Sequence, residues 1–144
     1  MRVLDATVGI AGAYCGKLLA DSGADVYLAE VPGGHPLAGR RPSPAAAPGA
    51  LFAFLSAGKV AAGDRTDFDV VLADAGSGAQ PVPSRIRVSF SPFGLDGPWA
   101  TRPATEITLQ AMTGSVGKRR LPGRPPVFAG GAPIEFAAGS YAAA

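Results

Sequence analysis

The first 30 residues change hydrophobic period twice, and this feature constrains the fold more than any other part of the sequence. Residues 2–6 (RVLDA) form a short apolar run that is typical of a buried strand. In residues 10–22 the apolar side chains recur at helical spacing, which predicts an amphipathic helix, and Gly23 follows at a C-cap position. Residues 25–30 (DVYLAE) are rich in strand formers. A strand, a helix and a strand with short joins predict a right-handed βαβ unit with parallel pairing.

Further strands and helices are predicted along the rest of the chain. Residues 69–73 (DVVLA) have the apolar run of a third strand. Residues 85–90 (RIRVSF) alternate polar and apolar side chains, which favours a fourth strand nearer a sheet edge. Short helices are predicted at 49–57 and 105–113, and the apolar, alanine-rich residues 134–144 form the last predicted helix.

These elements predict one α/β domain over residues 1–144, with a Rossmann-like, mostly parallel sheet and flanking helices. Ligands bind such sheets at the carboxyl ends of the strands. Long loops rich in glycine and proline, such as 31–48, are also where function concentrates. A site is therefore expected in the loops that follow Ala6, Glu30 and Phe90.

The composition excludes several classes of function. The formal net charge is +2 and the basic residues occur in small groups, which favours small anionic ligands over nucleic acid. A single cysteine precludes an internal disulfide and suits a reducing compartment, so we interpret the protein as cytoplasmic. Charged residues interrupt the N-terminal apolar stretches well short of the ~20 residues that a membrane span requires. The only histidine, His35, has no Cys or His partners with which to complete a metal site.

Three glycines, Gly9, Gly12 and Gly16, follow the first predicted strand and open the first predicted helix. Glycines at this turn let the phosphate of a ligand approach the backbone N–H groups at the helix N-terminus. Glu30 occupies the place of the ribose-binding acid in a dinucleotide-binding fold. The spacing is not G-x-G-x-x-G, however, and close packing of the helix on the strand explains small residues equally well. An NAD- or FAD-binding module and a purely structural role both stay open.

Charged side chains near the expected loops are the candidates for ligand chemistry. Arg40 and Lys59 lie in or beside loops that converge on one end of the sheet, where cationic groups suit phosphate or carboxylate ligands. Glu106 and Glu135 are the candidate carboxylates. Glu135 lies in an otherwise apolar stretch, which is typical of a functional carboxylate. It also fits the first turn of the last helix, where negative charge is favoured, and the residues alone favour this capping role.

Taken together, these segments resemble the amino-terminal part of CoA-transferase family III, the CaiB/BaiF type. The resemblance is carried, in order, by VLDATVGIAGAYCGKLLADSGADVYLAEVPGGHPL, FLSAGK, SFSPFGLDGPWATRPATEITLQAMTG and PVFAGGAPIEFAAGSYAAA. It spans nearly the whole chain and implies the Rossmann-like large domain of that family. The domain is expected to be incomplete, because the family's smaller second domain and its returning carboxyl-terminal segment are absent.

The resemblance implies an enzyme without a metal that moves coenzyme A (CoA) from an acyl-CoA to a carboxylic acid. In the family an aspartate attacks the thioester, which gives a mixed anhydride and then an enzyme-linked CoA thioester. Glu135 aligns with that aspartate. The resemblance also implies that Arg40 and Lys59 pair with CoA phosphates, and that the loop near the adenine or pantetheine arm is shaped by Gly9, Gly12 and Ala13. The implied assembly is a homodimer or a complex with the remainder of the transferase.

Several positions depart from the family pattern. Glu135 replaces the aspartate, Ala13 replaces a proline and His35 replaces an acidic residue. The segment 59–69 is too short for the strand and helix that the family has there. Thr105 stands at the approximate position of the histidine of the related methylacyl-CoA racemases, which disfavours racemase chemistry. These departures favour an alternative, a degenerate half without catalysis that serves assembly or ligand binding beside an active copy.

Overall fold

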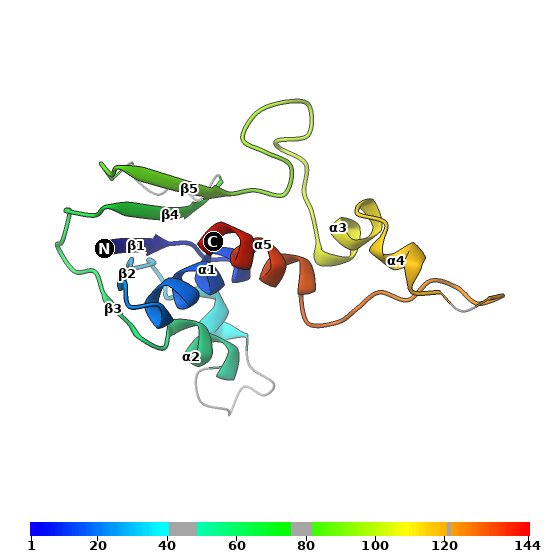
Figure 1. Cartoon of the computed structure of the whole chain (residues 1–144), viewed down its shortest axis with the longest axis horizontal. Helices are drawn as coiled ribbons and strands as arrows, with labels where there is room; N and C mark the ends of the chain where they lie inside the picture. Colours follow the sequence, from blue (N-terminus) through cyan, green and yellow to red (C-terminus); the bar gives the residue numbers. More distant parts are fainter. Residues whose placement is uncertain (41–48, 76–81, 121) are drawn as a thin grey trace.

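The computed structural model describes residues 1–40, 49–75, 82–120 and 122–144 of the chain. Its strands are β1 (Arg2–Ala6), β2 (Asp25–Leu28), β3 (Lys59–Ala61), β4 (Val70–Asp74) and β5 (Ile86–Phe90). These strands form one sheet in the order β3-β2-β1-β4-β5, and every pairing between neighbours is parallel (Figure 1). The predicted Rossmann-like α/β class with a mostly parallel sheet is confirmed.

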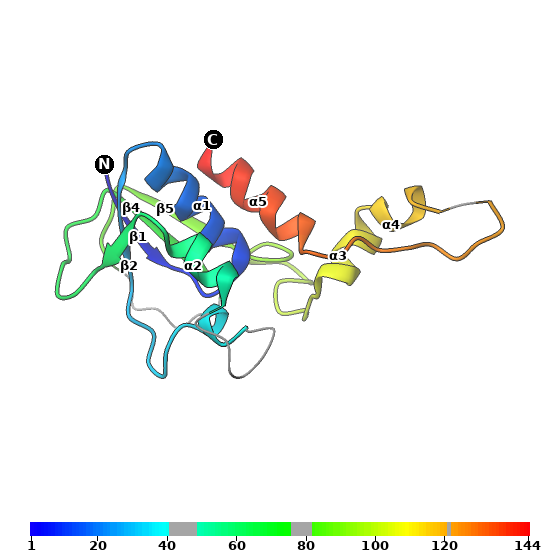
Figure 2. The ribbon, with the colours of Figure 1, turned by 90° about the horizontal axis from the view of Figure 1, so that it is seen from below.

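The helices of the described residues are α1 (Ile10–Asp21), α2 (Ala50–Ser56), α3 (Glu106–Met112), α4 (Ser115–Lys118), α5 (Pro133–Ala143) and the short 3-10 helix η1 (Pro36–Gly39). α1 packs on β1, β2 and β4, and both α2 and α5 contact α1 (Figure 2). α3, α4 and the loop after them project from the sheet as an arm, which contacts α5 through α3 (Figure 1). Among the described residues no helix is long and apolar enough to cross a membrane.

The first βαβ unit forms as predicted, because its residues show clear hydrophobic periods. β1 and β2 pair in parallel, and α1 connects them. Gly23 follows α1 with φ 93°, a left-handed conformation that glycine adopts without strain, so it ends the helix as predicted. β5 is an edge strand, in agreement with the alternation of polar and apolar residues in its sequence.

The segment after α2 contains a strand that the sequence did not indicate. We expected residues 59–69 to be too short for both a strand and a helix; residues 59–61 form β3 at the edge of the sheet beside β2, and no helix lies between β3 and β4. Three residues are too few to show a hydrophobic period, so the sequence carries no signal for this strand. Its stabilisation comes from the backbone ladder with β2 instead. The last part of the predicted loop 31–48, residues 41–48, lies outside the described residues.

The main core forms between the sheet and α1. Val3, Val26 and Leu72 come from three adjacent strands and meet Cys15 of α1, and all four are nearly inaccessible to solvent. Burial and the neighbouring Asp5 carboxylate raise the pKa of the Cys15 thiol to about 11. The thiol therefore stays protonated at neutral pH and behaves as a small core side chain.

α1 and α5 approach each other closely at a glycine. A Cβ atom added to Gly139 would lie 2.4 Å from the carbonyl oxygen of Ala11 and 3.2 Å from the Cys15 nitrogen, so a larger residue does not fit without movement. Nearby, the Tyr14 and Phe136 rings meet edge to face with centroids 4.9 Å apart. This contact fixes where α5 lies over the sheet, and thereby where the first turn of α5 begins.

Replacement of Gly139 by alanine should separate the two helices. We expect Gly139→Ala to lower the free energy of unfolding by about 1–3 kcal/mol, measured by urea denaturation, because the added methyl group overlaps the backbone of α1. Gly117→Ala is the matched control, since Gly117 in α4 has open space where its Cβ would lie. Equal stability of the two variants would contradict the close approach of α1 and α5.

Candidate active site

A cavity of about 630 Å³ lies at the carboxyl ends of β4 and β5, between the start of α1 and the start of α5. Strand order reverses between β1 and β4, and in open α/β sheets ligands bind outside the strand ends at this switch point. We call the cavity the carboxylate pocket because three of its lining residues are acidic. Among the residues that line it are Gly9, Phe90, Thr105 and the three carboxylates Asp74, Glu106 and Glu135.

The backbone amides at the start of α1 are bound by two of these carboxylates. Asp74 Oδ2 accepts hydrogen bonds from Val8 N at 2.6 Å and from Gly9 N at 3.1 Å. Glu135 Oε2 accepts from Ile10 N at 3.1 Å. The N-terminus of a helix carries partial positive charge, so it attracts both anionic groups. A Cβ on Gly9 would lie 3.6 Å from Asp74 and 3.9 Å from Glu135, which places Gly9 between the two carboxylates.

The capping role that the residues favoured for Glu135 is fulfilled at a different helix. Glu135 does lie in the first turn of α5, but its carboxylate binds the first amide of α1. The amides of α5 bind Glu106 instead, whose Oε1 accepts from Ile134 N at 2.9 Å and whose Oε2 accepts from Glu135 N at 3.4 Å. Both candidate carboxylates therefore stabilise helix starts, and each does so in a neighbouring element.

Asp74 is a site residue that the sequence reasoning missed. It is the last residue of β4 and follows directly on the predicted strand 69–73. A carboxylate at the carboxyl end of a buried parallel strand was a usable signal, because that end of the sheet is where ligands bind. The loop after β4 was not among the loops in which a site was expected.

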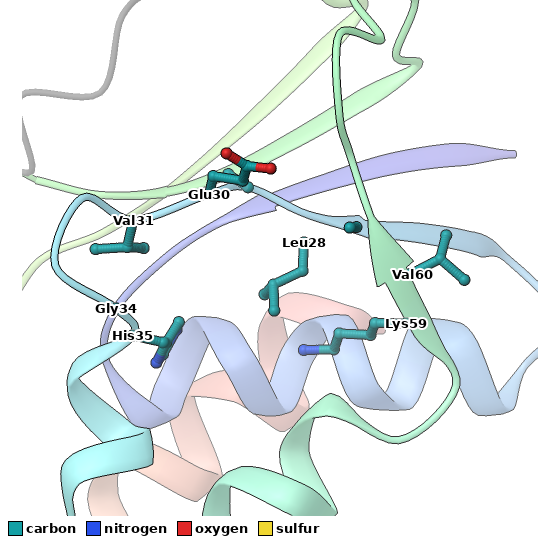
Figure 3. A pocket seen from close by; sticks show the side chains of 9 residues that line it. Leu28, Glu30, Val31, Gly34, His35, Lys59 and Val60 are labelled. Carbon is teal, nitrogen blue, oxygen red and sulfur yellow. The ribbon is translucent and has the colours of Figure 1, made fainter.

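A second cavity of about 400 Å³ lies at the carboxyl ends of β2 and β3, and Glu30, His35 and Lys59 are among its lining residues (Figure 3). The His35 ring is held between two backbone groups. Its Nδ1 accepts from Leu37 N at 3.2 Å, and its Nε2 lies 3.1 Å from the Thr7 carbonyl oxygen. With Nδ1 as an acceptor, Nε2 carries the proton and donates to Thr7. His35 thus ties the loop before η1 to the end of β1.

The Lys59 ammonium is directed into the protein. Its Nζ lies 2.6 Å from Asp5 Oδ2 and 2.7 Å from the Ala13 carbonyl oxygen, and the Lys59 side chain is 1% exposed. The other Asp5 oxygen accepts from the backbone N and the hydroxyl of Thr7 at 3.1 and 2.6 Å. A contact between Lys59 and a CoA phosphate thus requires this ion pair to open, and the phosphate role stays a prediction.

The remaining predicted residues lie outside the carboxylate pocket. A Cβ on Gly12 would lie 2.2 Å from Thr7 Cγ2, so this glycine lets α1 pack on the end of β1. Ala13 is 4% exposed and packs among Ile10 and other core residues. Arg40 follows η1, is exposed, and lines neither of the two cavities. Of the residues predicted to act on a ligand, the structure thus brings Gly9, Glu106 and Glu135 together.

Over residues 1–40, 49–75, 82–120 and 122–144, no group of three or more His, Cys, Asp or Glu side chains is arranged to hold a metal ion. The backbone amides at the start of α1, which favour anions, are occupied by the Asp74 and Glu135 carboxylates.

Comparisons with known proteins give a consistent result. The sequence profile of CoA-transferase family III matches residues 1–63 and 79–144. A CaiB/BaiF family protein from Brucella suis is 24% identical, with a TM-score of 0.83 over 99% of this chain. A hypothetical protein from Mycobacterium tuberculosis is 24% identical in one crystal structure, with a TM-score of 0.70. An orthorhombic form of the Mycobacterium protein gives 25% identity and a TM-score of 0.72.

This chain covers 46% of the Brucella protein, and 46% and 48% of the Mycobacterium protein in the two crystal structures, so it spans about half the length of either. A search of curated proteins finds no significant match. The likeness to the solved structures shows the fold, and the profile match shows the family.

The buried ion pair makes a prediction that separates a structural from a ligand-binding Lys59. We expect Lys59→Met to lower the free energy of unfolding by about 3–5 kcal/mol in urea denaturation, because it leaves the Asp5 carboxylate buried without its partner. The Asp5→Asn/Lys59→Met double variant should recover part of this loss. Lys118→Met, at an exposed lysine, is the control and should change stability by less than about 0.5 kcal/mol. A Lys59→Met variant as stable as this control, but with weakened CoA binding, would assign Lys59 to the ligand.

Proposed function

The chain belongs to CoA-transferase family III, and on this premise we propose that it binds acyl-CoA in the carboxylate pocket and that Glu135 is its nucleophile. The observation that carries the proposal is the place of the Glu135 carboxylate. It lies at the positive end of α1, beside a cavity at the switch point of the sheet, and it is half-buried. A carboxylate held at the edge of such a cavity can meet a carbonyl group that enters the cavity.

The proposed reaction moves CoA between two carboxylic acids through covalent intermediates. A Glu135 oxygen attacks the thioester carbonyl carbon, the carbon–sulfur bond breaks, and CoA leaves as the thiolate. The thiolate then attacks the glutamyl carbonyl of the resulting anhydride and releases the first acid as its carboxylate. The acceptor acid attacks the glutamyl-CoA thioester in the same way, which releases the CoA thiolate and forms a second anhydride. The thiolate then attacks the acyl carbon of the acceptor, which gives the new acyl-CoA and releases the Glu135 carboxylate. No redox step or metal is required.

The start of α1 suits this chemistry because it presents amide donors to developing negative charge. The attack on a thioester places charge on its carbonyl oxygen, and preorganised backbone N–H groups are effective at stabilising such an oxyanion. In the free protein Glu135 occupies the Ile10 amide. As a Glu135 oxygen bonds to the thioester carbon, negative charge moves from Glu135 to the thioester oxygen, so in our proposal the Ile10 amide exchanges the glutamate for the oxyanion.

The binding of the rest of CoA is also part of the proposal. Arg40 is the exposed cation proposed for the phosphates. Lys59 is proposed to join Arg40 only if its ion pair with Asp5 opens. Gly12 packs against Thr7 and Ala13 packs in the core, and these contacts support the turn between β1 and α1. We place this activity in a homodimer or in association with the remainder of a transferase, because the chain spans about half of its solved relatives.

A second candidate function is a non-catalytic half that binds a ligand or serves assembly. It is favoured by the hydrogen bond between Glu135 and the first amide of α1, since helix capping alone accounts for a carboxylate at this position. The two candidates differ in one chemical respect. Only the transferase forms a covalent bond at Glu135.

The test is to trap that bond. The chain is incubated with acyl-CoA, quenched with hydroxylamine and digested, and the peptide that contains Glu135 is analysed by mass spectrometry. We expect a hydroxamate at Glu135, its loss in Glu135→Gln, and a retained or larger yield in Glu135→Asp, which restores the family's residue. Asp74→Asn controls for labelling at the neighbouring carboxylate.

Each other result points to a different conclusion. Binding of CoA without any labelling would favour the non-catalytic half. A hydroxamate at Asp74 would move the nucleophile to β4. Absence of CoA binding by equilibrium dialysis would contradict the transferase and would leave assembly as the role of the non-catalytic half.

A further inference from the structure

We infer that Glu106 and Gln110 are positioning residues for Glu135, which they fix through the backbone at the start of α5. The inference rests on the proposed function, in which Glu135 is the nucleophile. Glu106 and Gln110 lie four residues apart on α3, so their side chains project from the same face of the helix. We call this pair the α3 clasp.

The start of α5 lacks a cap of its own. The N-cap residue Ala132 makes no side-chain hydrogen bond, and its φ of 56° is a left-handed conformation that residues other than glycine rarely adopt. Helix starts leave amides unpaired, and here Glu106 accepts two of them, from Ile134 and from Glu135 itself. The carboxylate of one helix therefore holds the backbone of the proposed nucleophile in another.

Gln110 holds Glu106 and the segment before α5 at the same time. Its Nε2 donates to Glu106 Oε1 at 2.9 Å and to the Ala129 carbonyl oxygen at 2.8 Å. Its Oε1 accepts from Ala129 N at 2.9 Å and from Arg119 Nη1 at 3.1 Å. Both amide donors and both acceptor positions are thus used, and the residue is 0% exposed.

The two members of the clasp differ in their access to a ligand. Glu106 lines the carboxylate pocket, whereas Gln110 is buried and does not line it. An effect of Gln110 on the reaction at Glu135 must therefore pass through the backbone of α5, either by way of Glu106 or by way of the Ala129 segment that leads into α5. This difference makes Gln110 the informative position, because loss of a substrate contact cannot explain what its replacement does.

The expected consequence is a loss of rate and not of affinity. Glu135 is fixed at its carboxylate by Ile10 N, along its helix by the Gly139 contact with α1, and at its backbone by the clasp. Loss of Gln110, which does not line the cavity, leaves the first turn of α5 free to move while the CoA contacts stay in place. A misplacement of about 1 Å at a reacting group can cost about 100-fold in rate.

The experiment compares Gln110→Met, which keeps the length of the side chain but forms no clasp, with Met112→Gln on the exposed part of the same helix. Three quantities are measured: the rate of hydroxamate formation at Glu135, the Kd for CoA, and the hydrogen exchange of the Ile134 and Glu135 amides. For Gln110→Met we expect a rate lowered about 10- to 100-fold, a Kd that stays within about 2-fold, and exchange at both amides faster by about 10-fold or more. Met112→Gln should match the unmodified chain.

The conservative variant Glu106→Gln keeps a carbonyl acceptor for the α5 amides. The Ile134 and Glu135 amides should exchange more slowly in Glu106→Gln than in Glu106→Ala. Glu106→Gln should also form the hydroxamate at Glu135 faster. This pair carries the test if Gln110→Met unfolds the chain, which would appear as faster exchange of the α1 amides as well.

The outcomes that overturn the inference are distinct from those that overturn the proposed function. Unchanged rate and unchanged exchange in Gln110→Met would overturn the positioning role. A weakened Kd with an unchanged maximal rate would assign the pair to substrate binding instead. If the unmodified chain forms no hydroxamate, the proposed function fails. Hydrogen exchange then still tests the clasp, because slow exchange at Ile134 and Glu135 that depends on Gln110 shows that the clasp fixes the start of α5.

Discussion

The need to satisfy the amides at the start of α1 is the constraint on which the rest of the site depends. A helix leaves its first amides without partners, and Gly9, at the N-cap of α1, has no side chain to supply one. Asp74 from β4 and Glu135 from α5 fill these positions. One local requirement of the backbone thus joins the end of a central strand and the start of a distant helix at one point. The cavity lies where these elements meet.

The buried ion pair of Asp5 and Lys59 connects three elements, and two of them, β1 and α1, flank the turn at the carboxylate pocket. Asp5 belongs to β1, Lys59 to β3, and the Ala13 carbonyl that shares the ammonium belongs to α1. Two charges with almost no exposure are costly to bury and costly to separate. Gly16 belongs to the same arrangement, since a Cβ there would lie 2.9 Å from Asp5 Oδ2 and 3.0 Å from Lys59 Nζ. The turn between β1 and α1, beside the carboxylate pocket, is therefore supported by an ion pair that is closed to solvent.

The sequence predicted the elements that are long enough to show a hydrophobic period. β1, α1 and β2 are long enough to show their periods, whereas β3 is a three-residue strand whose partners lie in β2. Individual side chains were harder to predict. Lys59 is equally consistent with an exposed phosphate ligand and a buried ion pair, because the choice depends on Asp5, which is 54 residues away. Gly12 serves the packing of α1 on Thr7, which was the structural alternative for the glycine pattern.

Family resemblance located Glu135, and the three-dimensional arrangement adds what surrounds it. The resemblance does not reveal that Glu106 caps α5, or that Asp74 shares the start of α1 with Glu135. The central claim is that the reactive end of CoA meets the start of α1 beside Glu135. Titration of the ¹⁵N-labelled chain with CoA, followed by NMR, tests it most directly. We predict that the amides of Gly9, Ile10 and Glu135 shift together along one binding curve, while Ser22 at the far end of α1 stays unchanged. Saturable binding that leaves Gly9, Ile10 and Glu135 unshifted would contradict the account.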